Sequence, residues 1–257
     1  MIKAVFLDID GTMVSFKTHR VPDNTKIALL EARNRGVKIF VCTGRSATDI
    51  NNLDDMEFDG YITVNGAFCM VGEKVIFKKS IAAEDIRSFI RYVEEIEPIS
   101  CFFVEKDKVS ANMINEQMKQ MMKIVEFTPR PTLPIREFAD KEIFQLTAFF
   151  SVEHEEKLMK HLPGCVSTRW YPTFADIVAC GVDKSVGMQK FGEYFGFVRD
   201  EMMAIGDGGN DIPMIKYAGV GVAMGNADDE VKLAADFIAS SVDEDGVGNA
   251  FRYYGIL

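Results

Sequence analysis

The segment spanning residues 3–12 constrains the fold more than any other stretch of the chain. Residues 4–7 form an apolar run that is too short for a helix and is soon followed by a glycine. Such a run is typical of a strand buried on both faces at the centre of a parallel sheet. Asp8 and Asp10 follow it, and the two-residue period of a strand would direct both carboxylates the same way. Folding gives no reason to place two like charges together there, whereas a divalent cation does.

Strands and helices alternate after this first strand. A helix is expected over residues 25–35, with Ile27, Leu30 and their neighbours on one face and Gly36 at its end. Apolar runs at 37–42 and 61–64 predict two more strands, separated by a short helix that ends at about residue 53. This order of elements indicates a doubly wound parallel sheet with right-handed crossovers.

The alternation breaks between residues 81 and 182. A hairpin at 68–71 and 75–77 precedes the break, and the segment itself pairs strands across hairpin-length gaps. The expected strands lie at 101–105, 109–112, 143–150, 165–170 and 174–179, and the expected helices at 84–95, 115–126 and 153–161. The alternation resumes with a helix at 184–195 and a strand at 202–205. We therefore expect an α/β fold: a doubly wound parallel-sheet, Rossmann-like core of residues 1–80 and 183–257, with an inserted α+β domain of residues 81–182.

Composition narrows the classes of partner. The net charge of −10 argues against nucleic acid or an anionic membrane, because both require a basic surface. No apolar stretch approaches the roughly 18 residues of a membrane span, and no secretory signal is apparent. The five cysteines are scattered, which predicts reduced thiols and a cytoplasmic location. An anionic ligand would have to be attracted by local groups, against the field of the whole chain.

Polar residues follow the predicted strands where ligands of open parallel sheets bind, beyond the carboxyl ends. The clusters are Asp8 with Asp10, Thr43 with Gly44, Asn65 with Gly66, and residues 207–211, and Lys184 opens the helix that leads into the last of them. Carboxylates, a hydroxyl, a lysine and glycines that expose backbone N–H groups together form a set suited to an anion and a metal ion.

Four of these patterns together resemble the motifs of the haloacid dehalogenase (HAD) superfamily. They are Asp8-Ile-Asp-Gly-Thr12, Thr43-Gly-Arg45, Lys184 and Gly206-Asp-Gly-Gly-Asn-Asp211, in the family's order and across the whole chain. The insertion resembles the cap of the Cof-type, class IIB subgroup, most of whose members are phosphatases of sugar phosphates and related small molecules. The resemblance implies a phosphatase, that is, a phosphoric monoester hydrolase.

The resemblance also implies a role for each matched residue. Asp8 would be the nucleophile that forms an aspartyl-phosphate, and Asp10 would protonate the leaving alcohol and then activate water. Mg²⁺ would be held by the Asp8 side chain, the Asp10 carbonyl and Asp207. Asp211 would be either a further ligand of the metal or a residue that contacts the ligands without touching the metal. The phosphoryl oxygens would be bound by Thr43, the Gly44 N–H, Lys184 and Asn210, joined by the N–H groups of Ile9 and Asp10. Thr12 would orient Asp10.

Each assignment has a plainer alternative. Thr43 with Gly44 resembles an ordinary strand-to-helix cap, Lys184 a solvated lysine, and residues 206–211 a turn. Arg45 is either a site residue or a member of an ion pair, and Asn65 either a site residue or a turn residue. In the insertion, Arg169, Trp170 and Asp176 either contact a sugar or are a packed aromatic and surface charges.

We expect from this sequence a Mg²⁺-dependent phosphatase of a small phosphorylated metabolite, such as a hexose or pentose phosphate, without an obligate protein partner. A phosphomutase is the alternative with the same nucleophile. A phospho-accepting signalling domain resembling a response-regulator receiver is the alternative from another class.

Overall fold

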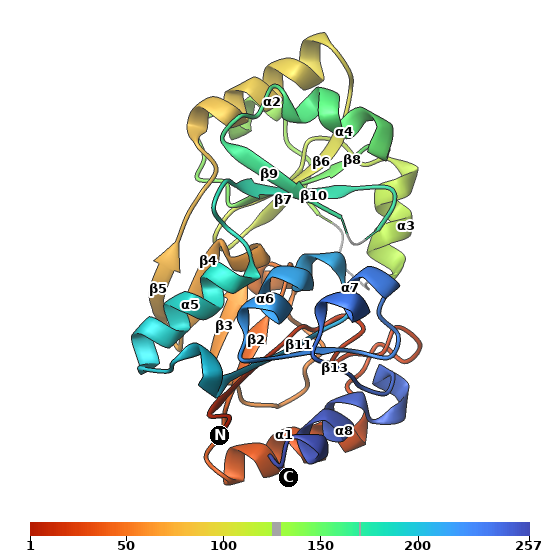
Figure 1. The fold of residues 1–257 in the computed structure, drawn as a ribbon. Helices are drawn as coiled ribbons and strands as arrows, with labels where there is room; N and C mark the ends of the chain where they lie inside the picture. Colours follow the sequence, from red (N-terminus) through yellow and green to blue (C-terminus); the bar gives the residue numbers. More distant parts are fainter. Residues whose placement is uncertain (125–129, 170) are drawn as a thin grey trace.

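The computed structural model describes residues 1–124, 130–169 and 171–257, and it arranges their strands in two sheets (Figure 1). The larger sheet has eight strands in the order β13-β12-β11-β1-β2-β3-β4-β5. Its strands are β1 (Ala4–Leu7), β2 (Lys38–Cys42), β3 (Gly60–Thr63), β4 (Phe68–Val71), β5 (Lys74–Lys78), β11 (Met202–Gly206), β12 (Val220–Ala223) and β13 (Phe237–Ile238). The strands from β13 to β3 are parallel, and β4 and β5 are added antiparallel at one edge.

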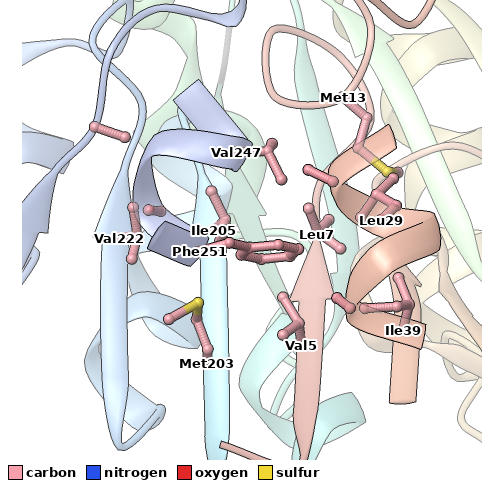
Figure 2. Close-up of a cluster of buried hydrophobic side chains, with 14 of the residues drawn as sticks. Val5, Leu7, Met13, Leu29, Ile39, Met203, Ile205, Val222, Val247 and Phe251 are labelled. Carbon is pink, nitrogen blue, oxygen red and sulfur yellow. The ribbon is translucent and has the colours of Figure 1, made fainter. Parts of the chain in front are cut away.

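Strand β1 lies near the middle of this sheet, between β11 and β2, and is buried on both faces. Its side chains alternate: Val5 and Leu7 belong to one hydrophobic cluster, and Ala4 and Phe6 to another. Helices α1 (Asp23–Asn34) and α8 (Gly246–Tyr253) cover the first face, where Phe251 lies over the sheet near Leu7 (Figure 2). Helices α5 (Lys184–Phe195) and α6 (Ile212–Tyr217) cover the second face, and α7 (Asp229–Ala234) packs beside β12. The residues of β1 are all apolar because both faces of this strand are covered by helices.

The second sheet is antiparallel and contains five strands in the order β7-β6-β8-β10-β9. They are β6 (Ser100–Val104), β7 (Val109–Ala111), β8 (Gln145–Phe149), β9 (Cys165–Thr168) and β10 (Ala175–Ala179), with helices α2 (Ala83–Glu95), α3 (Glu116–Ile124) and α4 (Val152–Met159). Helices α2 and α4 pack on one face of this sheet (Figure 1). The other face contacts residues of the larger sheet, because Phe102 and Val178 share a cluster with Val64 and Phe68.

The α/β class and the inserted α+β module agree with the sequence-based expectation, but two local predictions are wrong. Ile27 and Leu30 of α1 are 55% and 61% exposed, and the buried face of that helix is made by Ala28, Leu29 and their neighbours. A helical wheel places these two sets on opposite sides, and the small Ala28 permits close approach to the sheet. The helix expected to end near residue 53 is only a 3₁₀ turn, Ala47–Asp49.

Two predictions lie outside the described residues: Trp170 and the last part of the helix expected over 115–126. Among the helices of the described ranges, none has both the length and the apolar run that a membrane span needs.

Candidate active site

The candidate residues gather where the parallel strands of the larger sheet end and the inserted sheet begins. Asp8 follows β1, Thr43 follows β2 and Asp207 follows β11, and all three line one cavity of about 440 Å³. The inserted sheet supplies the opposite wall, with Phe102, Asp176 and other side chains. This volume falls within the range of small-molecule sites.

Three carboxylates and one ammonium group form the centre of the site. Lys184, the first residue of α5, is fully buried, and its Nζ lies 2.5 Å from Asp8 Oδ1 and 2.5 Å from Asp211 Oδ1. Asp8, Asp207 and Asp211 each offer an oxygen, and these oxygens lie within 4.8 Å of one another. The Asp183 side chain accepts bonds from the N–H groups of Ser185 and Val186, so the first turn of α5 is capped and Lys184 is held in place.

Burial and mutual repulsion perturb the charges of this cluster. Burial, together with repulsion by the neighbouring carboxylates, raises the pKa of Asp8 to about 7 against the attraction of Lys184. Burial and the charges of Asp8 and Asp211 raise the pKa of Asp207 well above its usual range. Burial alone would lower the pKa of Lys184, but Asp211 and Asp8 outweigh it and raise that pKa. One ammonium therefore does not compensate three carboxylates.

This donor set fits a divalent cation. Carboxylate oxygens are the ligands that Mg²⁺ prefers, and Asp8, Asp207 and Asp211 bring three of them within 4.8 Å of one another. Asp8, Asp207 and Asp211 would hold the ion. Asp211 also fixes the loop itself, because its Oδ2 accepts the N–H groups of Asp207 (3.0 Å) and Gly208 (2.9 Å).

Glycine is required at two positions of these loops. A Cβ at Gly206 would lie 2.5 Å from both Cβ and Cγ of Asp211. A Cβ at Gly11, where φ is +80°, would collide with Asp207. The close approach of backbone and carboxylates explains why both motifs contain glycine.

Asp10 is separated from the metal-type cluster, although the strand period predicted that both aspartates point the same way. The strand ends at Leu7, and the Asp10 carboxylate forms a bidentate ion pair with Arg45, at 2.6 and 2.7 Å. Arg45 is therefore a member of an ion pair and also lines the cavity. The prediction that Thr12 orients Asp10 is wrong. The Thr12 hydroxyl donates to Asp207 Oδ1 (2.9 Å), because the turn at Gly11 directs it toward β11.

The residues expected to bind the phosphoryl group lie around the same cavity. Thr43, Gly44 and Asn210 line it, and the Thr43 Oγ1 accepts the N–H of Arg45 at 3.1 Å. Asn65 has a left-handed backbone, with φ of 52°, and its buried side chain accepts a bond from Asn210 Nδ2 at 2.9 Å. The side chain of Ile9 is buried in the hydrophobic core.

In the insertion, Asp176 lies in β10 and lines the cavity. Arg169 also lines it, but its guanidinium is tied to Glu155 and to the carbonyls of Phe150, Pro172 and Phe174. Trp170 is not described.

The sequence reasoning missed four residues at the boundary between the larger sheet and the insertion. Gln145 and Thr147 of β8 face the cavity beside Asp176, and Arg130 forms an ion pair with Asp49 of the 3₁₀ turn. Two polar residues at a spacing of two within the apolar run 143–150 were a readable signal for the first pair. The second pair has no local signal, because its partners are far apart in the chain.

Comparison with known proteins gives a consistent assignment. A sequence profile of haloacid dehalogenase-like hydrolases matches residues 5–251. The protein YkrA of Bacillus subtilis (strain 168), which is named as a phosphatase, is 32% identical over 256 residues, covering 99% of this chain and 98% of YkrA. The structure of the HAD subclass IIB sugar phosphatase BT4131 is 42% identical, covers 99% of this chain and 100% of that one, and superposes with a TM-score of 0.95. The phosphatase BT1666 from Bacteroides thetaiotaomicron is 40% identical, with coverage of 100% and 96% and a TM-score of 0.92.

Proposed function

The chain belongs to the haloacid dehalogenase-like hydrolases, and we propose that it is a Mg²⁺-dependent phosphatase that hydrolyses small sugar phosphates through an aspartyl-phosphate at Asp8. One observation carries this proposal. Asp8 directly follows the central strand β1, lines the cavity, and shares a compact cluster with two further carboxylates and the buried Lys184. Relatives that are phosphatases by name, including a sugar phosphatase, support the substrate class.

The first chemical step would use Asp8 as the nucleophile. Its Oδ1 accepts the bond from Lys184, so Oδ2 is the oxygen that would attack phosphorus. The bond from phosphorus to the ester oxygen breaks, and Asp10 supplies the proton that this oxygen takes up as it leaves. Thr43, Asn210 and the Gly44 N–H would bind the phosphoryl oxygens as charge builds up on them. A bound Mg²⁺ would supply charge neutralisation beside Asp8, Asp207 and Asp211.

The second step would regenerate Asp8. Asp10, now ionised, takes a proton from water, the water oxygen bonds to phosphorus, and the bond between phosphorus and Asp8 breaks to release inorganic phosphate. The bidentate contact with Arg45 favours an ionised Asp10 carboxylate, which supports the proposed role of Asp10 as the base in this step.

We propose that residues 81–182 act as a cap that selects the leaving group and excludes water. The cavity wall that this segment supplies combines apolar side chains such as Phe102 with polar ones such as Asp176. A sugar presents both kinds of surface, and enclosure between two sheets would keep bulk water from the aspartyl-phosphate.

Replacement of Asp8 tests the proposal. In a screen of sugar phosphates with Mg²⁺, Asp8→Asn should lower phosphate release by on the order of 10⁴-fold or more, since it removes the nucleophile. The exposed Asp55→Asn is the matched control and should retain wild-type rates. Rapid acid quenching of the wild type should trap a phosphorylated Asp8, detected by mass spectrometry. Full turnover by a folded Asp8→Asn, isomerised sugar without free phosphate, or an adduct that survives for minutes would each refute it.

A further inference from the structure

A cluster of three polar side chains interrupts the apolar face of the inserted sheet that lies toward the larger sheet. Gln145 and Thr147 of β8 and Asp176 of β10 lie on this face, with Thr147 directly opposite Asp176 in the strand pairing. All three are buried, and Asp176 is only 3% exposed. A carboxylate in such a place is costly unless hydrogen bonds compensate it.

The hydrogen bonds of Asp176 reach across to the larger sheet. Its Oδ1 accepts from Thr147 Oγ1 (2.7 Å) and Gln145 Nε2 (2.9 Å), and its Oδ2 accepts from Asn65 Nδ2 (3.2 Å). The same Asn65 nitrogen also donates to Gln145 Oε1 at 3.0 Å. Both oxygens of Asp176 accept hydrogen bonds here, and this fixes which way its amide neighbours turn. Asn65 must present its nitrogen to the inserted sheet and its oxygen to the opposite side.

The orientation of the Asn65 amide determines the orientation of the Asn210 amide. Asn65 Oδ1 accepts from Asn210 Nδ2 at 2.9 Å, which fixes Asn210 with its nitrogen toward Asn65 and the cavity edge. The second hydrogen on that nitrogen remains available to an anion. A Cβ at Gly44 would lie 3.1 to 3.4 Å from the amide atoms of Asn65 and Asn210, so the backbone there already confines both amides.

We propose that Asp176 is a positioning residue for the phosphoryl site: through Asn65 it fixes the direction of the Asn210 amide. The inference rests on the proposed function, in which Asn210 binds phosphoryl oxygens. With an amide in place of the carboxylate, position 176 can present either an oxygen or a nitrogen to Asn65. Asn65 and Asn210 can then turn over together, and Asn210 would present its oxygen to an anion.

Binding of inorganic phosphate to the Mg²⁺-loaded protein tests this without requiring turnover. Asp176→Asn is isosteric and should weaken phosphate binding, measured by calorimetry, about tenfold, which corresponds to one lost hydrogen bond to a charged group. Asp140→Asn is the matched control. Asp140 also lies in the inserted segment, but its side chain is 94% exposed and pairs with Arg87, so phosphate affinity should not change.

The relay is tested by combining substitutions. In an Asn210→Ala background, Asp176→Asn should have no further effect on phosphate affinity, because the group it positions is gone. A merely structural role would lower the melting temperature and add its full effect in either background. Wild-type affinity in Asp176→Asn, or the same loss in both backgrounds, would overturn the proposal.

A second variant keeps the proposal testable if Asp176→Asn does not fold. Asn65→Gly tolerates the left-handed backbone and removes the oxygen that accepts from Asn210, so the Asn210 amide is no longer held in one direction. It should weaken phosphate binding by a similar factor, and unchanged affinity would contradict the relay. Failure of the proposed function is seen separately, as full turnover by Asp8→Asn.

Discussion

Replacing Lys184 by methionine should expose how much of the stability of the fold depends on one buried ammonium. Lys184 is 0% exposed and contacts Asp8 and Asp211 at 2.5 Å each, with Asp207 close to both carboxylates. Methionine fills a similar volume, so the packing of α5 changes little while the positive charge is lost. The side chains left behind are three neighbouring carboxylates without a buried cation among them.

The magnitude follows from this geometry. Removing one partner of a buried ion pair costs about 3 to 5 kcal/mol, because the remaining charge is left without compensation. We therefore expect Lys184→Met to lower the free energy of unfolding by about 3 to 5 kcal/mol at pH 7.5 without metal. For a chain of this length that is a fall in melting temperature of roughly 10 °C. The loss should be smaller at pH 5.5, where the carboxylates take up protons, each unit of pKa shift being worth about 1.4 kcal/mol.

Calorimetric melting of the metal-free protein in a chelator measures this loss. Lys190→Met, two turns further along α5, is the matched control, because Lys190 pairs with Glu193 at the surface. It should change the stability by no more than about 0.5 kcal/mol. Addition of Mg²⁺ should stabilise Lys184→Met more than the wild type, since more negative charge is left to compensate. A Lys184→Met protein within about 1 kcal/mol of the wild type at pH 7.5 would refute the view that this ammonium compensates the cluster.

Three further perturbations probe other parts of the site. The pKa of Asp8 is about 7 in the folded chain and 3.8 in the unfolded chain, so the stability that Asp8 contributes is present below about pH 4 and lost as the pH rises toward 7. Asp8→Asn should therefore flatten that part of the plot of unfolding free energy against pH, measured by urea unfolding of the metal-free protein. Arg130→Gln leaves the buried Asp49 without its ion pair and should lower the free energy of unfolding by about 2 kcal/mol after allowance for solvent screening. The same urea unfolding measures this loss, and a change below about 0.5 kcal/mol would argue against a stabilising contact between Arg130 and Asp49. Gly206→Ala places a methyl 2.5 Å from Asp211 and should cost about 1 to 3 kcal/mol and weaken Mg²⁺ binding in a calorimetric titration; unchanged metal affinity would show that the loop adapts.

The elements and their order were predictable because they depend on local patterns. The apolar runs that end at residues 7, 42 and 64 each mark a buried parallel strand, and the polar residues after them mark its carboxyl end. Once the strands are parallel, the residues beyond their ends meet at one edge of the sheet. Lys184 follows no strand, so its assignment to the same site as Asp8, 176 positions away, depended on its place in the order of the family's motifs.

The partners within the site were less predictable, because they depend on how each turn directs its side chains. Thr12 is two residues from Asp10, yet it bonds Asp207, which is 195 positions away, since the chain reverses at Gly11. The buried face of α1 was also misassigned. The prediction placed the large apolar side chains in the core, whereas the closely packed contact is made by the small Ala28. The ion pair of Arg130 with Asp49 joins segments that are far apart in the chain and carry no motif, so only the three-dimensional arrangement reveals it.

The charges around the cavity show how a chain with a net charge of −10 can select a phosphate ester. Each arginine that lines the cavity is already engaged with a carboxylate: Arg45 with Asp10, Arg130 with Asp49 and Arg169 with Glu155. These pairs bring hydrogen-bond donors to the wall without creating a positive field, so long-range attraction of an anion is absent. Recognition must therefore act at short range, through directed amide and backbone N–H groups beside the carboxylate cluster. Short-range contacts are screened little by salt, and they favour a ligand whose oxygens match the donors over anions that match only in charge.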